Sequence, residues 1–361
     1  MILKNPFYLG FYFLNSKEWT VITMFSQCIR RRLFCFFILI SLLSGCHSTR
    51  ERTLTVYTYS SFPVKLIETV KEKFKKDYQI TVDFKSFSDT GPLFNQLIRE
   101  RKKPVADVVI GLDNNYFFKA EEAGLFQSYQ PQGLDKVPKE LIFDSQYRLV
   151  PFDYGYVVFN YDREKLKNPP ASFSDLLKPE YQGKIIIMNP LTSSPGQIFL
   201  LTTVAFFGED GYLDYWRKLK SNLLTIAPGW EEGYGMYTSG EAPIVLSYGT
   251  SPVYHLLYDN TERYQPLVLN NTAYAQIEAA GIVKGAPHLK EAKMLMDYIL
   301  STEFQELIPE TQFMYPVRSD AALPESFRVA AKVDRLLNLP PEQVSKKLDK
   351  WLADWENVIN E

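Results

Sequence analysis

The segment LTVYTYSSFPVKLIETVKEKFKKDYQITVDF, residues 54–84, decides the fold class of this 361-residue chain. Residues 54–59 alternate between apolar and polar side chains, which predicts a strand. Residues 63–78 carry apolar side chains at helical spacing, and residues 80–84 favour a second strand. A strand, a helix and a strand in this order predict a βαβ unit with parallel strands, and therefore an α/β domain.

The same alternation of strands and helices continues along the chain. A helix is expected over residues 93–100 and a short β-branched strand over 106–111, as in a sheet covered on both faces. The ligand crevice of such a sheet lies at the carboxyl ends of its strands. Further strands and helices are expected at residues 184–188, 195–207, 211–219, 230–237 and 243–247, followed by mostly helical structure after residue 288.

Two long extended runs, residues 148–159 and 273–283, bracket the middle third of the chain. They predict that the chain crosses between two domains twice, since a chain of this length exceeds what one core fills. We therefore expect a discontinuous lobe 1 formed by residues 53–152 and 278–361, and a lobe 2 formed by residues 153–277.

The N-terminal region has the pattern of a secretory signal. Three arginines at 30–32 precede a mostly apolar run over 33–43, which is too short to cross a bilayer stably. The following sequence, Leu43-Ser44-Gly45-Cys46, is the pattern by which bacterial lipoproteins are acylated and cleaved. We therefore predict a lipoprotein signal peptide over residues 1–45, with translation starting at Met1 or Met24.

Acylation of Cys46 predicts a protein held at a membrane surface, in the periplasm or on the cell surface, with residues 46–52 as a polar tether. The alternative is an ordinary secretory signal that happens to contain Cys46. Cys28 and Cys35 would leave with the signal, so that the mature protein has no disulfide and no thiol nucleophile.

Composition and spacing exclude several classes of function. Removal of residues 1–45 takes away five Lys/Arg and one Glu, which changes the formal net charge from −2 to −6. An acidic chain without a basic run argues against nucleic acid as a partner. The histidines at 47, 255 and 288 are too far apart for a recognisable metal motif, and no nucleotide or hydrolase motif occurs. We expect no metal, no cofactor and no catalysis.

Aromatic residues make up 15% of the chain and several stand where strands end or helices begin. Tyr59 and Tyr248 follow predicted strands, and Trp230 opens a predicted helix. Such side chains face the crevice, where they can stack on a flat ligand or cover a cation. Residues 189–196 and 248–252 each lead from a strand into a helix start, a natural site for an anion, although both fit plain helix caps equally well.

Several multi-residue stretches resemble one known family, in collinear order over residues 54–325. They are YTY at 57–59, GLDNN at 111–115, VPFDYGY at 150–156, LKNPP at 166–170, LSY at 246–248, TSP at 250–252 and MYPV at 314–317. These stretches are similar to those of the thiamine-binding periplasmic proteins of ABC importers. The resemblance implies the type II periplasmic-binding-protein fold, with two α/β lobes that close on the ligand about a two-strand hinge. It also implies a monomer that binds thiamine or its phosphate esters and delivers them to an ABC permease and ATPase.

The resemblance also implies which residues contact the ligand. It places the family's acidic residue and its neighbour at Asp89 and Thr90, a phosphate-side pair at Ser193 and Ser194, and the stacking tryptophan at Trp230. The remaining positions implied by the resemblance are Tyr59, Tyr248, Gly249, Thr250, Ser251, Pro252, Tyr254 and Phe313. Two departures concern the pocket wall. The segment after the first strand, which can carry a Trp-Gly-Pro-Gly stretch in the family, is shorter here, at residues 62–66, and Phe313 replaces a tryptophan.

Other functions remain open at this point. A receptor of the same fold for ferric iron would need clustered tyrosine, histidine and carboxylate side chains, and one for a polyamine would need several acids and no phosphate site. An extracytoplasmic thiamine-degrading enzyme of this fold would need a cysteine nucleophile. A purely structural surface lipoprotein would need none of the predicted site residues.

Overall fold

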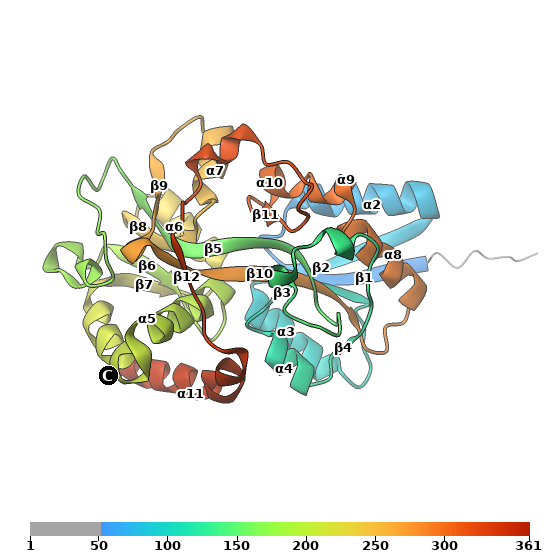
Figure 1. The fold of residues 1–361 in the computed structure, drawn as a ribbon, viewed down its shortest axis with the longest axis horizontal. Helices are drawn as coiled ribbons and strands as arrows, with labels where there is room; N and C mark the ends of the chain where they lie inside the picture. The colour runs from blue at the N-terminus through green and yellow to red at the C-terminus, as the bar shows by residue number, and fades with distance from the viewer. Residues whose placement is uncertain (1–51) are drawn as a thin grey trace, which may run out of the picture. The chain divides into compact units, whose positions relative to one another are not determined.

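The computed structural model describes residues 52–361, which form an α/β structure around one mixed sheet (Figure 1). The predicted α/β class is confirmed. The predicted signal peptide, Cys46 and residues 46–51 of the tether lie outside the described residues, and Arg52 already belongs to the first strand. Within residues 52–361, no helix is both long enough and apolar enough to cross a membrane.

Lobe 1 is built on three parallel strands with helices on both faces. Strand β1 lies between β2 and β3, as the βαβ pattern predicts. Helix α2 buries Leu66, Val70 and Phe74 against one face of these strands, and it ends at Gln79 in the left-handed conformation. Its elements are β1 (Arg52–Tyr59), α2 (Val64–Tyr78), β2 (Ile80–Phe87), α3 (Thr90–Glu100), β3 (Val108–Asp113), α4 (Phe117–Glu122) and β4 (Phe126–Gln127).

Lobe 2 repeats this plan around β6, a fully buried Ile-Ile-Ile-Met strand that pairs in parallel with β7 and β8. Gly208 has a φ of 73°, which interrupts the helical conformation of α5 between the two helices expected at 195–207 and 211–219. The elements are β6 (Ile185–Met188), α5 (Ser194–Leu219), β7 (Leu223–Ala227), α6 (Trp230–Thr238), β8 (Ile244–Tyr248), α7 (Ser251–Tyr258) and β9 (Tyr264–Leu267).

Two long strands carry the sheet from one lobe to the other, β5 (Val150–Asp162) and β10 (Thr272–Val283) (Figure 1). The strand order is β2-β1-β3-β10-β5-β8-β6-β7. Strand β10 pairs antiparallel with β3 of lobe 1, and β5 pairs antiparallel with β8 of lobe 2. The two strands also pair with one another, with Asp153 opposite Glu278 at an irregularity in the register. These are the two extended runs expected from the sequence.

The C-terminal part corrects the expected lobe boundary. Residues 278–361 were all expected in lobe 1, but α11 buries Val344, Leu348, Trp351 and Trp355 in the core of lobe 2, against α5. An amphipathic stripe specifies that a helix packs, but not on which core. The C-terminal elements are α8 (Leu289–Ile299), α9 (Thr302–Gln305), α10 (Ile308–Thr311), β11 (Tyr315–Pro316), β12 (Arg335–Leu337) and α11 (Pro341–Asn360).

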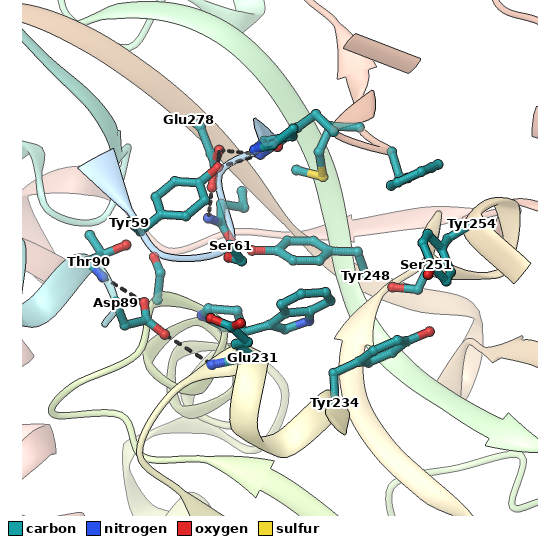
Figure 2. Close-up of a pocket in the computed structure, with 18 of the residues that line it drawn as sticks. Tyr59, Ser61, Asp89, Thr90, Glu231, Tyr234, Tyr248, Ser251, Tyr254 and Glu278 are labelled. Atoms are coloured by element: carbon teal, nitrogen blue, oxygen red, sulfur yellow. Dashed lines mark hydrogen bonds between the residues drawn. The ribbon is translucent and has the colours of Figure 1, made fainter. Parts of the chain in front are cut away.

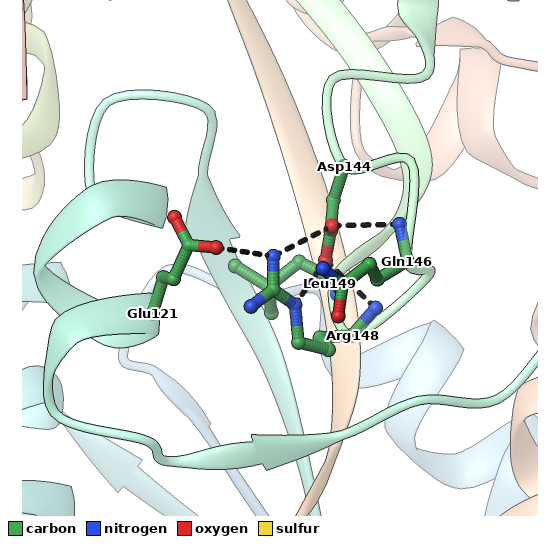
Figure 3. A network of polar contacts seen from close by, with 5 residues as sticks. All are labelled: Glu121, Asp144, Gln146, Arg148 and Leu149. Carbon is green, nitrogen blue, oxygen red and sulfur yellow. Dashed lines mark hydrogen bonds and ion pairs between the residues drawn. The ribbon is translucent and has the colours of Figure 1, made fainter. Parts of the chain in front are cut away.

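A buried ion-pair network fixes the turn that leads into β5 (Figure 3). The Asp144 carboxylate accepts hydrogen bonds from the backbone amides of Gln146, Arg148 and Leu149, at 3.0, 2.8 and 3.2 Å. The Arg148 guanidinium also contacts Asp144 and lies 2.7 Å from Glu121 of α4. Burial would raise the pKa of Asp144, but the hydrogen bonds from Arg148 and the three amides hold it below its ordinary value.

Replacement of this carboxylate tests how much the network stabilises lobe 1. We expect Asp144→Ala to lower the free energy of unfolding by about 2–4 kcal/mol, because three backbone amides and a guanidinium lose their acceptor. Since the folded-state pKa is depressed, the contribution of Asp144 is present above the ordinary aspartate pKa of about 4 and is lost as the pH falls.

Denaturant unfolding at pH 7 measures this loss. The matched control is Asp214→Ala, which removes an ion pair with Lys218 whose two side chains are about 60% exposed, and it should cost less than about 1 kcal/mol. Equal unfolding free energies for the two variants would contradict the structural role of Asp144.

Candidate functional site

A cavity of about 380 Å³ lies between the two lobes, at the carboxyl ends of β1 and β8 and against β10. Its walls come from both lobes and from the crossing strands, so that a bound molecule would contact all three. The lining residues are Tyr59, Ser61, Pro63, Asp89, Thr90, Ser194, Pro195, Trp230, Glu231, Tyr234, Gly235, Thr238, Tyr248, Ser251, Tyr254, Gln276, Glu278, Thr311, Gln312, Phe313 and Met314.

All of the ionisable side chains that line the cavity through a charged head group are acidic. The lining contains the carboxyl groups of Asp89, Glu231 and Glu278, whereas none of the lining residues is a lysine, arginine or histidine. Most of the large side chains are aromatic. Acidic groups beside aromatic faces attract a flat organic cation, and the negative charge opposes a strongly anionic ligand.

Asp89 connects the two lobes at one end of the cavity. Its carboxylate accepts a hydrogen bond at 2.7 Å from the Thr90 amide at the start of α3, and one at 3.1 Å from the Trp230 amide at the start of α6 (Figure 2). Burial raises the pKa of Asp89, and the donors at Thr90, Ser193, Trp230 and Ser194 oppose the rise. The first turns of α3, α5 and α6 therefore all face the Asp89 carboxylate. The positive ends of the three helix dipoles stabilise a negative charge at this point.

Further polar contacts join the lobes beside Asp89. The Gly91 amide of lobe 1 donates to the Thr192 carbonyl at 3.2 Å, and the Ser60 hydroxyl donates to Glu231 at 2.7 Å. The Ser194 hydroxyl donates to the carboxyl group of Asp113, at the end of β3. Burial raises the pKa of Asp113 to about 7.

Glu278 lies on β10 at the floor of the cavity, where it accepts hydrogen bonds from Tyr59 at 2.7 Å and from Gln276 at 3.0 Å. Figure 2 shows the Tyr59 hydroxyl directed at this carboxylate. Burial raises the pKa of Glu278 to about 7. Burial and the neighbouring Glu278 raise the pKa of Asp153 well above its ordinary value.

Aromatic rings form the lobe 2 wall. The Trp230 ring stacks on Tyr234 with centroids 4.9 Å apart and planes at 15°, and it lies 6.2 Å from the ring of Tyr248. Tyr254 meets Phe313 of lobe 1 edge-on at 5.3 Å. These rings provide stacking surfaces on the side of the cavity opposite Tyr59.

The structure brings nine of the thirteen predicted ligand residues to the cavity: Tyr59, Asp89, Thr90, Ser194, Trp230, Tyr248, Ser251, Tyr254 and Phe313. Ser193, Gly249, Thr250 and Pro252 do not line it. Ser193 and Thr250 are buried behind the wall, and a Cβ at Gly249 would lie 2.5 Å from the Ala331 Cβ. The anion site expected at residues 189–196 needs a correction as well, because the carboxyl groups of Asp89 and Asp113 already face this helix start.

Sequence reasoning missed several lining residues, of which Glu278, Gln276, Tyr234 and Gln312 make most of the polar contacts. A signal was present for three of them. Gln276 and Glu278 stand two residues apart within the otherwise apolar strand over 272–283, so both side chains point to the same face. Tyr234 follows Trp230 by four residues on one helix face.

Comparison with known proteins identifies relatives over most of the chain. The family model of bacterial extracellular solute-binding proteins matches residues 103–336. The thiamine-binding periplasmic protein of Brucella abortus is 37% identical over 332 residues, which span 89% of this chain and 96% of that protein. That of Escherichia coli K12 is 35% identical over 310 residues, spanning 85% of this chain and 93% of that protein.

A solved structure of a periplasmic thiamin binding protein superposes with a TM-score of 0.81, at 34% sequence identity, over 88% of this chain and 98% of that one. The match confirms the expected type II periplasmic-binding-protein fold, two α/β lobes joined by two strands.

The close approach of Gly91 to Thr192 yields a test of the contact between the lobes. A Cβ at Gly91 would lie 2.7 Å from the Thr192 carbonyl oxygen, which is closer than real Cβ contacts. We therefore expect Gly91→Ala to hold the lobes further apart and to increase the radius of gyration measured by small-angle scattering.

Gly235→Ala is the matched control, because an added Cβ there meets no atom within 4 Å. Its radius of gyration should equal that of the unmodified protein. The same radius for Gly91→Ala would mean that the Gly91–Thr192 contact does not limit the approach of the lobes.

Proposed function

Because the chain belongs to the thiamine-binding periplasmic proteins, a family of bacterial extracellular solute-binding proteins, we propose that it captures thiamine outside the cytoplasm for an ABC importer. The observation that carries the proposal is the lining of the cavity. Acidic and aromatic side chains surround it, and none of its lining residues is a lysine, arginine or histidine.

Thiamine has the chemistry that such a lining favours. Its thiazolium ring carries a permanent positive charge, which suits aromatic faces such as those of Trp230 and Tyr248 and a carboxylate such as Glu278. Its aminopyrimidine has donors and acceptors for side chains such as Gln276 and Thr90. Capture between two lobes also favours a closed conformation when both lobes contact the ligand.

The electrostatics support thiamine itself rather than its phosphate esters as the preferred ligand. A phosphate group near the start of α5 would meet the carboxyl groups of Asp89 and Asp113 and no cationic side chain of the lining. The proposal therefore predicts tighter binding of thiamine than of thiamine monophosphate in parallel titrations.

The alternative ligands and the alternative reaction have less support. Burial raises the pKa of the Tyr59 and Tyr248 phenols well above their ordinary values, which opposes the phenolate form that ferric iron prefers. All three cysteines precede residue 52, so none stands in the described part of the chain as a nucleophile. A polyamine would use the acids of the cavity but would offer no flat ring to its aromatic wall.

Glu278→Gln tests the recognition of charge. We expect it to weaken thiamine binding about 10–100-fold, since the thiazolium cation loses a nearby carboxylate and a close charge pair contributes roughly 1.5–3 kcal/mol. Binding of 3-deazathiamine, a neutral analogue of the same shape, should change less than about threefold. In the unmodified protein, thiamine affinity should fall as the pH drops below about 7, because binding requires ionised Glu278.

Isothermal titration calorimetry measures all of these constants. Glu262→Gln removes a partly exposed ion pair with Arg328 and is the control variant with unchanged affinity. Equal losses of affinity for thiamine and 3-deazathiamine in Glu278→Gln would contradict the recognition of the thiazolium charge by Glu278.

We also propose that the mature protein begins at Cys46 and is anchored through acyl chains on that residue, as the signal pattern at 30–46 predicts. Cys46→Ala should then abolish incorporation of radiolabelled palmitate and leave an unprocessed precursor. Cys35→Ala, within the apolar run of the signal, is the control and should incorporate label normally. Label that persists in Cys46→Ala would refute lipidation at this residue.

A further inference from the structure

A row of polar groups begins in the aromatic wall of the cavity and leads away from it into lobe 2. The indole N–H of Trp230 donates to the Ser247 hydroxyl at 2.9 Å, and Ser247 lies 2.8 Å from the Ser251 hydroxyl. Burial raises the pKa of the Tyr234 phenol, and the neighbouring Ser251 hydroxyl opposes the rise as a hydrogen-bond donor. Figure 2 shows Tyr234 and Ser251 side by side at this wall.

The row continues from Tyr234 to the surface. The Tyr234 hydroxyl lies 2.9 Å from Nε2 of His255, and Nδ1 of His255 lies 2.7 Å from the Asp259 carboxylate. His255 and Ser247 are fully buried, whereas about half of the Asp259 side chain is exposed. The row thus joins a surface carboxylate to a ring that lines the cavity.

The chemistry of the two ends sets the direction of every bond in the row. An indole N–H only donates and an ionised carboxylate only accepts. Trp230 must therefore donate to Ser247, and Nδ1 of His255 must donate its proton to Asp259. The hydroxyl groups between them each donate one bond and accept one, so that Tyr234 donates to the free lone pair on Nε2 of neutral His255.

The surroundings of His255 favour the neutral form that this direction requires. Burial lowers the pKa of His255 despite the hydrogen bond to Asp259, and the nearby Arg263 adds to this effect. The other groups that face the imidazole are the rings of Tyr234, Tyr254 and Tyr264, which are uncharged at neutral pH.

We propose that His255 is a positioning residue for the ligand site, which holds the Trp230 ring in its stacking orientation through Tyr234, Ser251 and Ser247. The inference rests on the proposed function. The indole is only half-buried, and its polar contact within the described residues is the bond to Ser247. Loss of the acceptor at the far end lets the hydroxyl groups reorient and releases the ring, which lowers the preorganisation of the site.

Two replacements of His255 distinguish positioning through this row of polar groups, which we call the relay, from simple packing. His255→Phe keeps a buried ring but provides no acceptor for Tyr234. His255→Gln places an amide oxygen near the position of Nε2 and restores an acceptor without an imidazole. We expect His255→Phe to weaken thiamine binding about tenfold, the effect of one lost hydrogen bond in a buried network, and His255→Gln to restore affinity to within about threefold.

Tyr234→Phe interrupts the same row at another link and keeps the ring that stacks on Trp230. In a Tyr234→Phe background, His255→Phe should weaken binding less than about twofold further, because the link is already broken. Multiplicative losses in the double variant, or equal losses in His255→Phe and His255→Gln, would overturn the proposal.

A second readout needs no ligand. The indole ¹H–¹⁵N resonance of Trp230, assigned with Trp230→Phe, should shift in His255→Phe and return in His255→Gln. An unmoved resonance in His255→Phe would overturn the relay even if thiamine affinity falls. If the unmodified protein does not bind thiamine, the proposed function fails, while this resonance still decides whether His255 positions Trp230.

Discussion

The carboxylate of Asp89 is the constraint on which the site depends. It accepts hydrogen bonds from the first backbone amides of α3 in lobe 1 and of α6 in lobe 2, and it faces the start of α5. An anion held by converging helix starts from two lobes fixes their approach at one point. It also occupies the position at which these helix starts would otherwise bind an external anion.

The crossing strands add a second constraint, which also comes from acidic side chains. Asp153 on β5 and Glu278 on β10 face each other without a cationic partner among residues 52–361, and burial makes the ionisation of both unfavourable. The charge of Glu278 further raises the pKa of Asp153. A cation in the cavity favours the ionised form of Glu278. The residues that carry the sheet between the lobes therefore also respond to the charge of the ligand.

The sequence predicted the parts of the fold that follow from local periodicity. The βαβ unit at 54–84, both crossing strands and the two helices separated by Gly208 were expected, because side-chain spacing specifies them directly. The side on which α11 packs was not predictable, since an apolar stripe specifies that a helix packs but not on which core. Nine of thirteen expected site residues reached the cavity. Glu278 was missed although its spacing from Gln276 was a signal, because the pairing of distant strands is what brings β10 to the cavity.

The most direct test of the account is the mass of the small molecule that stays bound when the protein is purified under native conditions. Native mass spectrometry should show one thiamine per chain, which is released on unfolding and absent after exhaustive dialysis. The account predicts that added thiamine restores the same mass increment. Recovery of iron, a polyamine or only a phosphorylated compound, with no rebinding of thiamine, would contradict it.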